Sequence, residues 1–266
     1  MAAWHLNPAD TQEQGRVSCP SREEAADNWQ SVILLLSNRV AKGGTNMKYR
    51  TGVCIIALSV LAGPAAGQSE ERRFRLIPLE EMTPEQRTAA EAIMSGPRAS
   101  VPGSSATGKT PGSPFNPWLR SAELADRLQR VGEYLRFRSS IPPRLNEFAI
   151  LVTARQWDAQ YEWHANHRLA LQAGLNPAVA ADLAEGKRPA GMQEDETIVY
   201  NFCRELHQEH KVSDATYKAA LDKFGERGVM DLIAVSGYYV LVSMTLNVDR
   251  TPVPGDGKPP LRPLPR

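Results

Sequence analysis

Cysteine is scarce in this chain, and no two cysteines stand close enough in the sequence to act as a local pair. The three present are Cys19, Cys54 and Cys203, and none belongs to a Cys-x-x-Cys motif. A locally built redox dithiol or zinc knuckle is therefore excluded. Only Cys203 lies in the part expected to fold, where a single thiol is typically a buried small hydrophobic side chain.

An excess of one charge and long apolar runs are also lacking. The 31 basic and 30 acidic side chains leave a formal net charge of +1, which gives no reason to expect a nucleic-acid or anionic-membrane partner. Residues 232–246 carry no charge, but this stretch is shorter than the roughly 20 apolar residues that span a bilayer. It suits a buried core helix or a helix at a subunit interface.

Strand signals and internal repeats are missing as well. No segment alternates polar and apolar residues between hairpin turns, and the 20 prolines cluster outside the segments with helical periodicity. The sequence therefore predicts an all-α bundle of six or seven helices.

Residues 47–67 have the layout of an export signal. A basic start at Met47 to Arg50 precedes an apolar run at 53–62, and small residues follow up to Gly67. We expect cleavage after Gly67 and a periplasmic or secreted protein with no membrane contact after cleavage. Residues 1–46 would then be a spurious product of start-codon assignment or a disordered extension. The alternative is a genuine cytosolic extension followed by an incidental apolar stretch.

Proline, glycine and capping residues divide the remaining chain. They predict helices at 84–95, 121–135, 144–173, 177–186, 195–211, 213–224 and 228–247. On the second of these, Leu124, Leu128, Val131 and Leu135 are expected to face the core. Residues 68–114 would hold one helix and a flexible Gly/Pro/Ser-rich loop at 96–114, residues 115–250 the helical domain, and residues 251–266 an extended or disordered proline-rich tail.

Residues 103–110 match the letters of a P-loop, but not its context. Pro102 precedes the match and Pro111 follows it, where the motif needs a strand and a phosphate-binding helix. We therefore expect neither a nucleotide nor an organic cofactor.

Four blocks of sequence carry a family resemblance. They are Phe115-Asn-Pro-Trp-Leu-Arg-Ser-Ala-Glu-Leu-Ala-Asp, Pro142-Pro143-Arg144, the stretch from Glu147 through Tyr161-Glu162-Trp163 to Gly174, and Asp195-Glu-Thr-Ile-Val-Tyr-Asn-Phe. In this order they resemble the carboxymuconolactone decarboxylase family, which includes the alkylhydroperoxidase D-like proteins. The resemblance covers about residues 110–250 and implies the helical bundle of that family, assembled as a homo-oligomer (a trimer or hexamer).

The resemblance also suggests where the family's functional residues fall. Its peroxidase branch carries a glutamate, a Cys-x-x-Cys and a histidine on one helix, and these positions correspond to Glu147, to Ala159 and Glu162, and to Asn166. Both cysteines and the histidine are thus replaced. The resemblance therefore implies a member without dithiol peroxide reduction.

A straight helix over 144–173 would set the angles between these residues. Glu147 and Glu162 would lie roughly 60° apart around the axis, with Asn166 about 40° further and Asp158 about 20° from Glu147. Carboxylates on such a half-apolar face should have a raised pKa, which suits proton transfer near neutral pH. We expect Glu147 and Glu162 to be catalytic and Asn166 to orient a substrate.

A simpler interpretation of the two glutamates remains open. Glu147 would form a buried ion pair with Arg144 or Arg155, and Glu162 would be solvated.

Four of the five histidines form His-x-x-His pairs, His164/His167 and His207/His210. Either pair could hold a metal, yet the first points away from Glu147 by about 100°, so solvated histidines and no metal site are expected. His164 or His167 remains a candidate general base in place of the family histidine.

Aromatic residues complete the candidate site. Tyr161 and Trp163 are expected to bind a flat organic acid together with Trp157, Tyr238 and Tyr239, although such residues equally serve as core or subunit contacts.

The leading functional hypothesis is a small-molecule enzyme that acts on a lactone or keto acid by carboxylate acid/base chemistry. One alternative is alkylhydroperoxidase-like or peroxiredoxin-like activity through Cys203, and another is a non-catalytic ligand-binding bundle.

Overall fold

Capped helices joined by short turns make up the described part of the chain. The computed structural model describes residues 71–101, 108–255 and 260–264, all within one compact unit, Pro64–Arg266. In these ranges the fold is all-α, with no β-strand, as the sequence predicts. The proposed extension at 1–46, the signal segment at 47–67 and most of the P-loop-like stretch lie outside the described residues.

The N-terminal elements lead into a long helix, α4 (Ala122–Phe137). They are η1 (Leu79–Glu81), α2 (Pro84–Ser95), η2 (Pro97–Ser100), α3 (Phe115–Trp118) and η3 (Leu119–Ser121). The predicted capping box is confirmed, since the Thr83 side chain accepts from the Gln86 amide and the Gln86 side chain accepts from the Thr83 amide. The region predicted as a flexible loop contains η2, which places Arg98 over the ring of Phe115, 5.0 Å from its centroid.

The face of α4 that is buried differs from the predicted one. Leu135 is buried, but Leu124 is 48% and Val131 45% exposed, and Ser121 provides no side-chain cap. The inner face of α4 instead carries four buried residues, Ala125, Gln129, Gly132 and Leu135. Gly132 is one of them, and a Cβ atom at this position would lie 2.2 Å from the hydroxyl oxygen of Tyr238.

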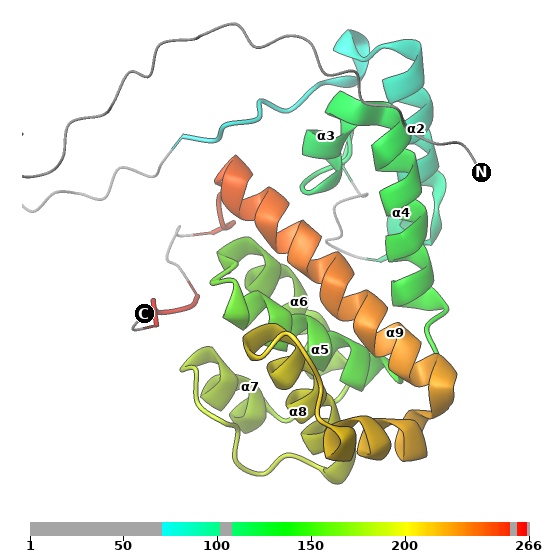
Figure 1. Cartoon of the computed structure of the whole chain (residues 1–266). Coiled ribbons are helices and arrows are strands. Elements are labelled where there is room, and N and C mark those ends of the chain that lie inside the picture. The colour runs from blue at the N-terminus through cyan, green and yellow to red at the C-terminus, as the bar shows by residue number, and fades with distance from the viewer. Residues whose placement is uncertain (1–70, 102–107, 256–259, 265–266) are drawn as a thin grey trace, which may run out of the picture. The chain divides into compact units, whose positions relative to one another are not determined.

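Helix α5 (Pro143–Gln156) is the centre of the bundle (Figure 1). Every residue from Leu145 to Arg155 is buried, and α5 contacts α6 (Gln160–Gln172), α7 (Pro177–Ala184), α8 (Glu194–Gln208) and α9 (Asp214–Asp249). At its start, Arg144 forms ion pairs with Asp195 and Glu196 of α8.

The prediction of one continuous helix over 144–173 is wrong. The chain turns between α5 and α6 at Trp157 to Ala159, where Asp158 adopts a left-handed conformation with φ of 48°. The Asp158 carboxylate accepts a hydrogen bond from Arg155 at 2.6 Å. No proline or glycine marks this turn in the sequence.

The predicted start of α7 is confirmed, and α8 has a cap that was not predicted from the sequence. Asn176 caps α7 through its side chain, with Pro177 at the first helical position. Helix α8 starts at a capping box formed by Gln193 and Glu196.

Helix α9 spans the two helices predicted for 213–224 and 228–247, with a kink between them. Ser213 caps its start, and Gly225 has φ of 68° and ψ of 177° in its interior. Of the described residues, only α9 forms a helix long and apolar enough to cross a membrane. The most apolar window of α9 is 56% buried in the bundle, as in many core helices of soluble proteins.

The C-terminal segment is not a free tail over its described part. Leu261 is 1% exposed, and its backbone amide and carbonyl both bond to the side chain of Gln160. Residues 260–264 are therefore non-helical but held in place, which contradicts disorder there and leaves the extended alternative.

Candidate active site

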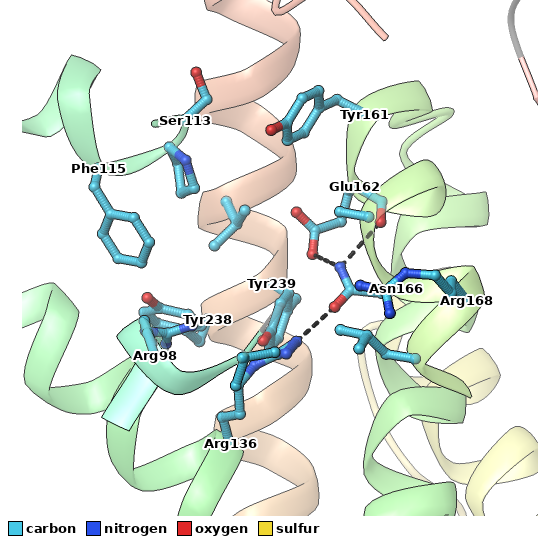
Figure 2. Close-up of a pocket in the computed structure, with 15 residues that line it drawn as sticks. Arg98, Ser113, Phe115, Arg136, Tyr161, Glu162, Asn166, Arg168, Tyr238 and Tyr239 are labelled. Carbon is cyan, nitrogen blue, oxygen red and sulfur yellow. Dashed lines mark hydrogen bonds between the residues drawn. The ribbon is translucent and has the colours of Figure 1, made fainter. Parts of the chain in front are cut away.

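A cavity of about 90 Å³ lies where α4, α6 and α9 meet the segments around Arg98 and Phe115 (Figure 2). Its wall contains three arginines and three tyrosines, together with Glu162 and Asn166. The cavity is small beside the roughly 300–1,000 Å³ of sites for drug-sized ligands. It suits a small organic molecule.

Glu162 lies in the wall of this cavity and is 3% exposed. One carboxyl oxygen accepts a hydrogen bond of 2.6 Å from the Asn166 side chain, and in Figure 2 the other oxygen points into the cavity. Burial raises the pKa of Glu162 to about 8, although Arg136 opposes the shift, and the charge of Glu147 raises this pKa further. Glu162 therefore holds a proton at neutral pH and can release it slightly above.

Arg136 of α4 connects the two predicted glutamates. Its guanidinium donates a hydrogen bond of 2.7 Å to the Asn166 side-chain oxygen and forms an ion pair of 3.2 Å with Glu147. Burial lowers the pKa of Arg136, but Tyr239 and the two carboxyl groups raise it by more. Arg136 is thus a permanent positive charge in the wall of the cavity.

Glu147 lies behind Arg136 and is not part of the cavity wall. Its Oε2 atom is buried without a hydrogen-bond partner among the described residues. Burial raises the pKa of Glu147, and Arg136 and Arg98 oppose this shift. The buried ion pair considered for Glu147 exists, but its partner is Arg136 and neither Arg144 nor Arg155, which bond to Asp195, Glu196 and Asp158.

The turn at Asp158 explains why the two glutamates share Arg136. On a straight helix, residues fifteen positions apart would be separated by about 22 Å along the axis. Because the chain turns between α5 and α6, both side chains reach the same guanidinium region. The two glutamates thus lie near one guanidinium, but only Glu162 lines the cavity, and the predicted straight-helix geometry is wrong. Asp158 itself pairs with Arg155 outside the cavity wall.

The other charged and aromatic wall residues come from distant parts of the chain. Arg98 of η2, Arg168 of α6, and Tyr238 and Tyr239 of α9 all line the cavity, and so does the predicted Tyr161. Burial raises the pKa of both α9 tyrosines, so their hydroxyl groups stay neutral hydrogen-bonding groups.

Sequence reasoning missed Arg98 and Arg136. Arg136 is one of three arginines on α4, and the other two, Arg127 and Arg130, form exposed pairs with acidic residues four positions away. No local pattern distinguishes Arg136 from them, because its burial results from α6 and α9.

Several predicted site residues lie outside the cavity wall. His164 is exposed, and His167 stacks on Trp163 with 5.7 Å between ring centroids. Trp163 is 3% exposed and belongs to the core. A general base at His164 or His167 and substrate binding by Trp163 are therefore not features of this cavity.

The second histidine pair is also split. His207 is within 3.0 Å of the Thr153 hydroxyl, whereas His210 is exposed. The described residues contain no group of three side chains placed to hold a metal ion.

Cys203 is buried, as predicted. It is 0% exposed, and burial raises the pKa of its thiol to about 11, although a contact of 3.5 Å with the Ser236 hydroxyl opposes the shift. A buried neutral thiol is a poor nucleophile.

Comparisons with protein-family models, with curated proteins and with solved structures found no match to this chain.

Proposed function

We propose that this chain is a small-molecule enzyme resembling the carboxymuconolactone decarboxylases, which transfers a proton to or from a small lactone or keto acid in the Glu162 cavity. The observation that carries the proposal is the environment of Glu162. Its carboxyl group is buried, has a pKa of about 8, and lies among positive charges at the wall of a cavity. A group that titrates near the working pH is suited to general acid/base catalysis.

The positive wall supports an anionic substrate. Arg98, Arg136 and Arg168 contribute positive charge, whereas Glu162 is protonated at neutral pH. Tyr161, Tyr238 and Tyr239 add hydroxyl groups and flat apolar surfaces. A small planar carboxylate satisfies both features.

In the proposed reaction, Glu162 acts first as an acid. Loss of carbon dioxide from a β-keto acid or its vinylogue leaves the electron pair of the broken bond on the substrate as an enolate. The positive charge of Arg136 stabilises this enolate, and Glu162 delivers its proton to the carbon atom that lost the carboxyl group. Water then returns a proton to Glu162.

The turnover test uses Glu162→Gln, which keeps the shape of the protonated side chain and removes its proton transfer. Assays would follow consumption of small keto acids and lactones, with a thermal shift recorded for each compound. We expect turnover to fall by a factor of about 10²–10⁴, while the helical circular dichroism signal is unchanged. Full activity of this variant contradicts the proposal. Ligand-induced stabilisation without turnover in the wild type would instead identify a binding bundle.

We further propose that the mature protein is exported to the periplasm or secreted and that it assembles with copies of itself. The export signal described from the sequence supports the first statement. Mass analysis of the native protein would detect a first residue after Gly67, and peptides from 1–46 would contradict it.

A further inference from the structure

A second, larger cavity shares no wall residue with the Glu162 site. It measures about 420 Å³ and lies among α5, the α7–α8 connection, α8 and the C-terminal segment. The proposed function makes no use of it.

The wall of this second cavity has an excess of positive charge. Arg155, Lys187 and Arg204 contribute three cations, and Asp158 is the single carboxylate of the wall. The side chains of Lys187 and Arg204 form no hydrogen bond or ion pair with any described residue, although the charge of Arg204 lowers the pKa of the neighbouring Glu205, whereas Arg155 is bonded to Asp158 at 2.6 Å. Two of the cations therefore remain available to a ligand.

Arg155 is the immobilised, buried cation of the cavity wall. Its side chain is 4% exposed, and it donates to the carbonyl oxygens of Ala184 and Arg262 as well as to Asp158. Its Nε atom is buried without a partner among the described residues. These contacts hold the guanidinium in place beside the two partner-free cations.

His207 adds an oriented hydrogen-bond acceptor. The Thr153 hydroxyl donates to the Ala149 carbonyl at 3.0 Å, so it accepts from Nε2 of His207, which lies 3.0 Å away. Because burial lowers the pKa of His207, the ring is neutral at pH 7. Its Nδ1 atom then carries a lone pair, which can accept a hydrogen bond from a ligand hydroxyl.

The C-terminal segment closes one side of this cavity. The Arg262 carbonyl accepts from Arg155, and the Leu264 side chain is part of the wall. Leu264 packs so closely on Gly186 that a Cβ atom there would lie 2.4 Å from it. The wall on this side is therefore held by specific contacts.

We propose that this cavity binds a phosphate group, either free or carried by a small organic molecule. A hydrogen phosphate dianion matches the positive charges of the Lys187 and Arg204 side chains, and its hydroxyl can donate a hydrogen bond to His207. In this proposal the exposed Lys187 and Arg204 side chains contact the phosphate oxygens, and the buried Arg155 guanidinium adds positive charge behind them.

Titration calorimetry of the purified protein with inorganic phosphate tests the site, at constant ionic strength maintained with chloride. We expect saturable one-site binding, which weakens at least tenfold in the Lys187→Ala/Arg204→Ala double variant. Arg127→Ala is the control, because Arg127 forms an exposed pair with Glu123 on α4 and is not part of the cavity wall. Its affinity should equal that of the wild type.

Three results would overturn the proposal. They are no saturable binding at 10-fold molar excess over a millimolar protein sample, equal affinities of the double variant and the wild type, and loss of phosphate binding in Glu162→Gln alone. The last result would place the anion in the other cavity. Because the Glu162→Gln turnover test uses different residues and a different readout, either proposal can fail without the other.

Discussion

Glu162 loses most of its contact with water on folding, and the stability of the protein should therefore depend on pH. Its pKa rises from 4.5 to about 8, mainly through burial. Between these values the unfolded chain releases the proton and the folded chain keeps it, so stability falls as pH rises through this window. The full penalty above pH 8 is on the order of 5 kcal/mol.

We therefore predict that Glu162→Gln removes this part of the pH dependence. The variant and the wild type should melt at similar temperatures near pH 4.5, and the variant should be more stable at pH 8. Calorimetric melting curves across this range would show the difference. Glu205→Gln is the opposite control, since hydrogen bonds from Ser213 and Thr216 lower the pKa of Glu205, and this variant should be less stable than the wild type at pH 8. If the melting temperatures of Glu162→Gln and the wild type change in parallel with pH, the raised pKa of Glu162 is contradicted.

Gly132 allows the wall of the Glu162 cavity to form. A Cβ atom there would lie 2.2 Å from the Tyr238 hydroxyl oxygen and 2.7 Å from an Arg98 guanidinium nitrogen. We predict that Gly132→Ala destabilises the protein by about 1–3 kcal/mol, because overpacking outweighs the better helix propensity of alanine. Urea denaturation would measure this change.

Gly237 is the matched control for Gly132. It lies on the exposed face of α9, and a Cβ atom at this position meets nothing within 4 Å. Gly237→Ala should therefore stabilise the single chain by roughly 0.5–1 kcal/mol, measured at a protein concentration too low for self-association. Stabilisation by both Gly132→Ala and Gly237→Ala would contradict the close approach of Tyr238 to α4.

The sequence predicts only some of the residues that form the site. Glu162, Asn166 and Tyr161 lie in the cavity wall, as expected from the block around Tyr161-Glu162-Trp163. Arg98 and Arg136 could not be found in this way, because an arginine that other elements bury looks the same in the sequence as one in solvent.

At the scale of elements, the turn between α5 and α6 is the main departure from the predicted fold. Residues 144–173 have continuous helical periodicity without a breaker, so the sequence alone favours one helix. The chain turns at Asp158, a residue type that tolerates left-handed backbone better than most. The position of the break depends on how α5 and α6 pack against each other, which a local sequence pattern does not contain.

We predict that Asp158→Ala and Asp158→Gly differ in stability. Both lose the ion pair with Arg155, but only alanine retains a Cβ atom in left-handed backbone with φ of 48°. Asp158→Ala should be less stable by about 1–2 kcal/mol, measured by chemical denaturation. Equal losses of stability in the two variants would mean that the ion pair with Arg155, and not the left-handed backbone, determines the effect.

At the scale of the whole molecule, α9 presents an exposed apolar face without charge. Met230, Ile233, Leu241, Met244 and Val248 are between 36% and 60% exposed, and they recur at the period of an α-helix. Contiguous apolar patches on a protein surface mark interaction sites. Together with the exposed Leu124, which lines a hollow with Met244 and Val248, this face is the candidate contact between copies.

We predict that the protein sediments as a homo-oligomer and that Met244→Lys shifts it toward the monomer. A charge at this position would be buried in the contact, whereas the monomer exposes it to water. Lys223→Ala, near the other end of α9, is the control. Lys223 is exposed, so this change should leave the sedimentation coefficient unaltered. A wild-type monomer at high protein concentration contradicts the contact.

The bundle itself is largely predictable, whereas the surfaces it buries are not. Caps at Thr83, Asn176 and Ser213 and the break at Gly225 mark element ends correctly, because these signals are local. The exposed side chains of Leu124 and Val131 show the limit, since periodicity identifies an apolar face without saying what covers it.

The turn at Trp157 to Ala159 also constrains how this chain can change in evolution. Inserting or deleting one residue there would rotate α6 by about 100° relative to α5, which would move Glu162 and Asn166 away from Arg136. Homologous chains that keep the cavity should therefore keep the length of this turn, with Asp, Asn or Gly at its left-handed position, and gaps in an alignment should fall elsewhere.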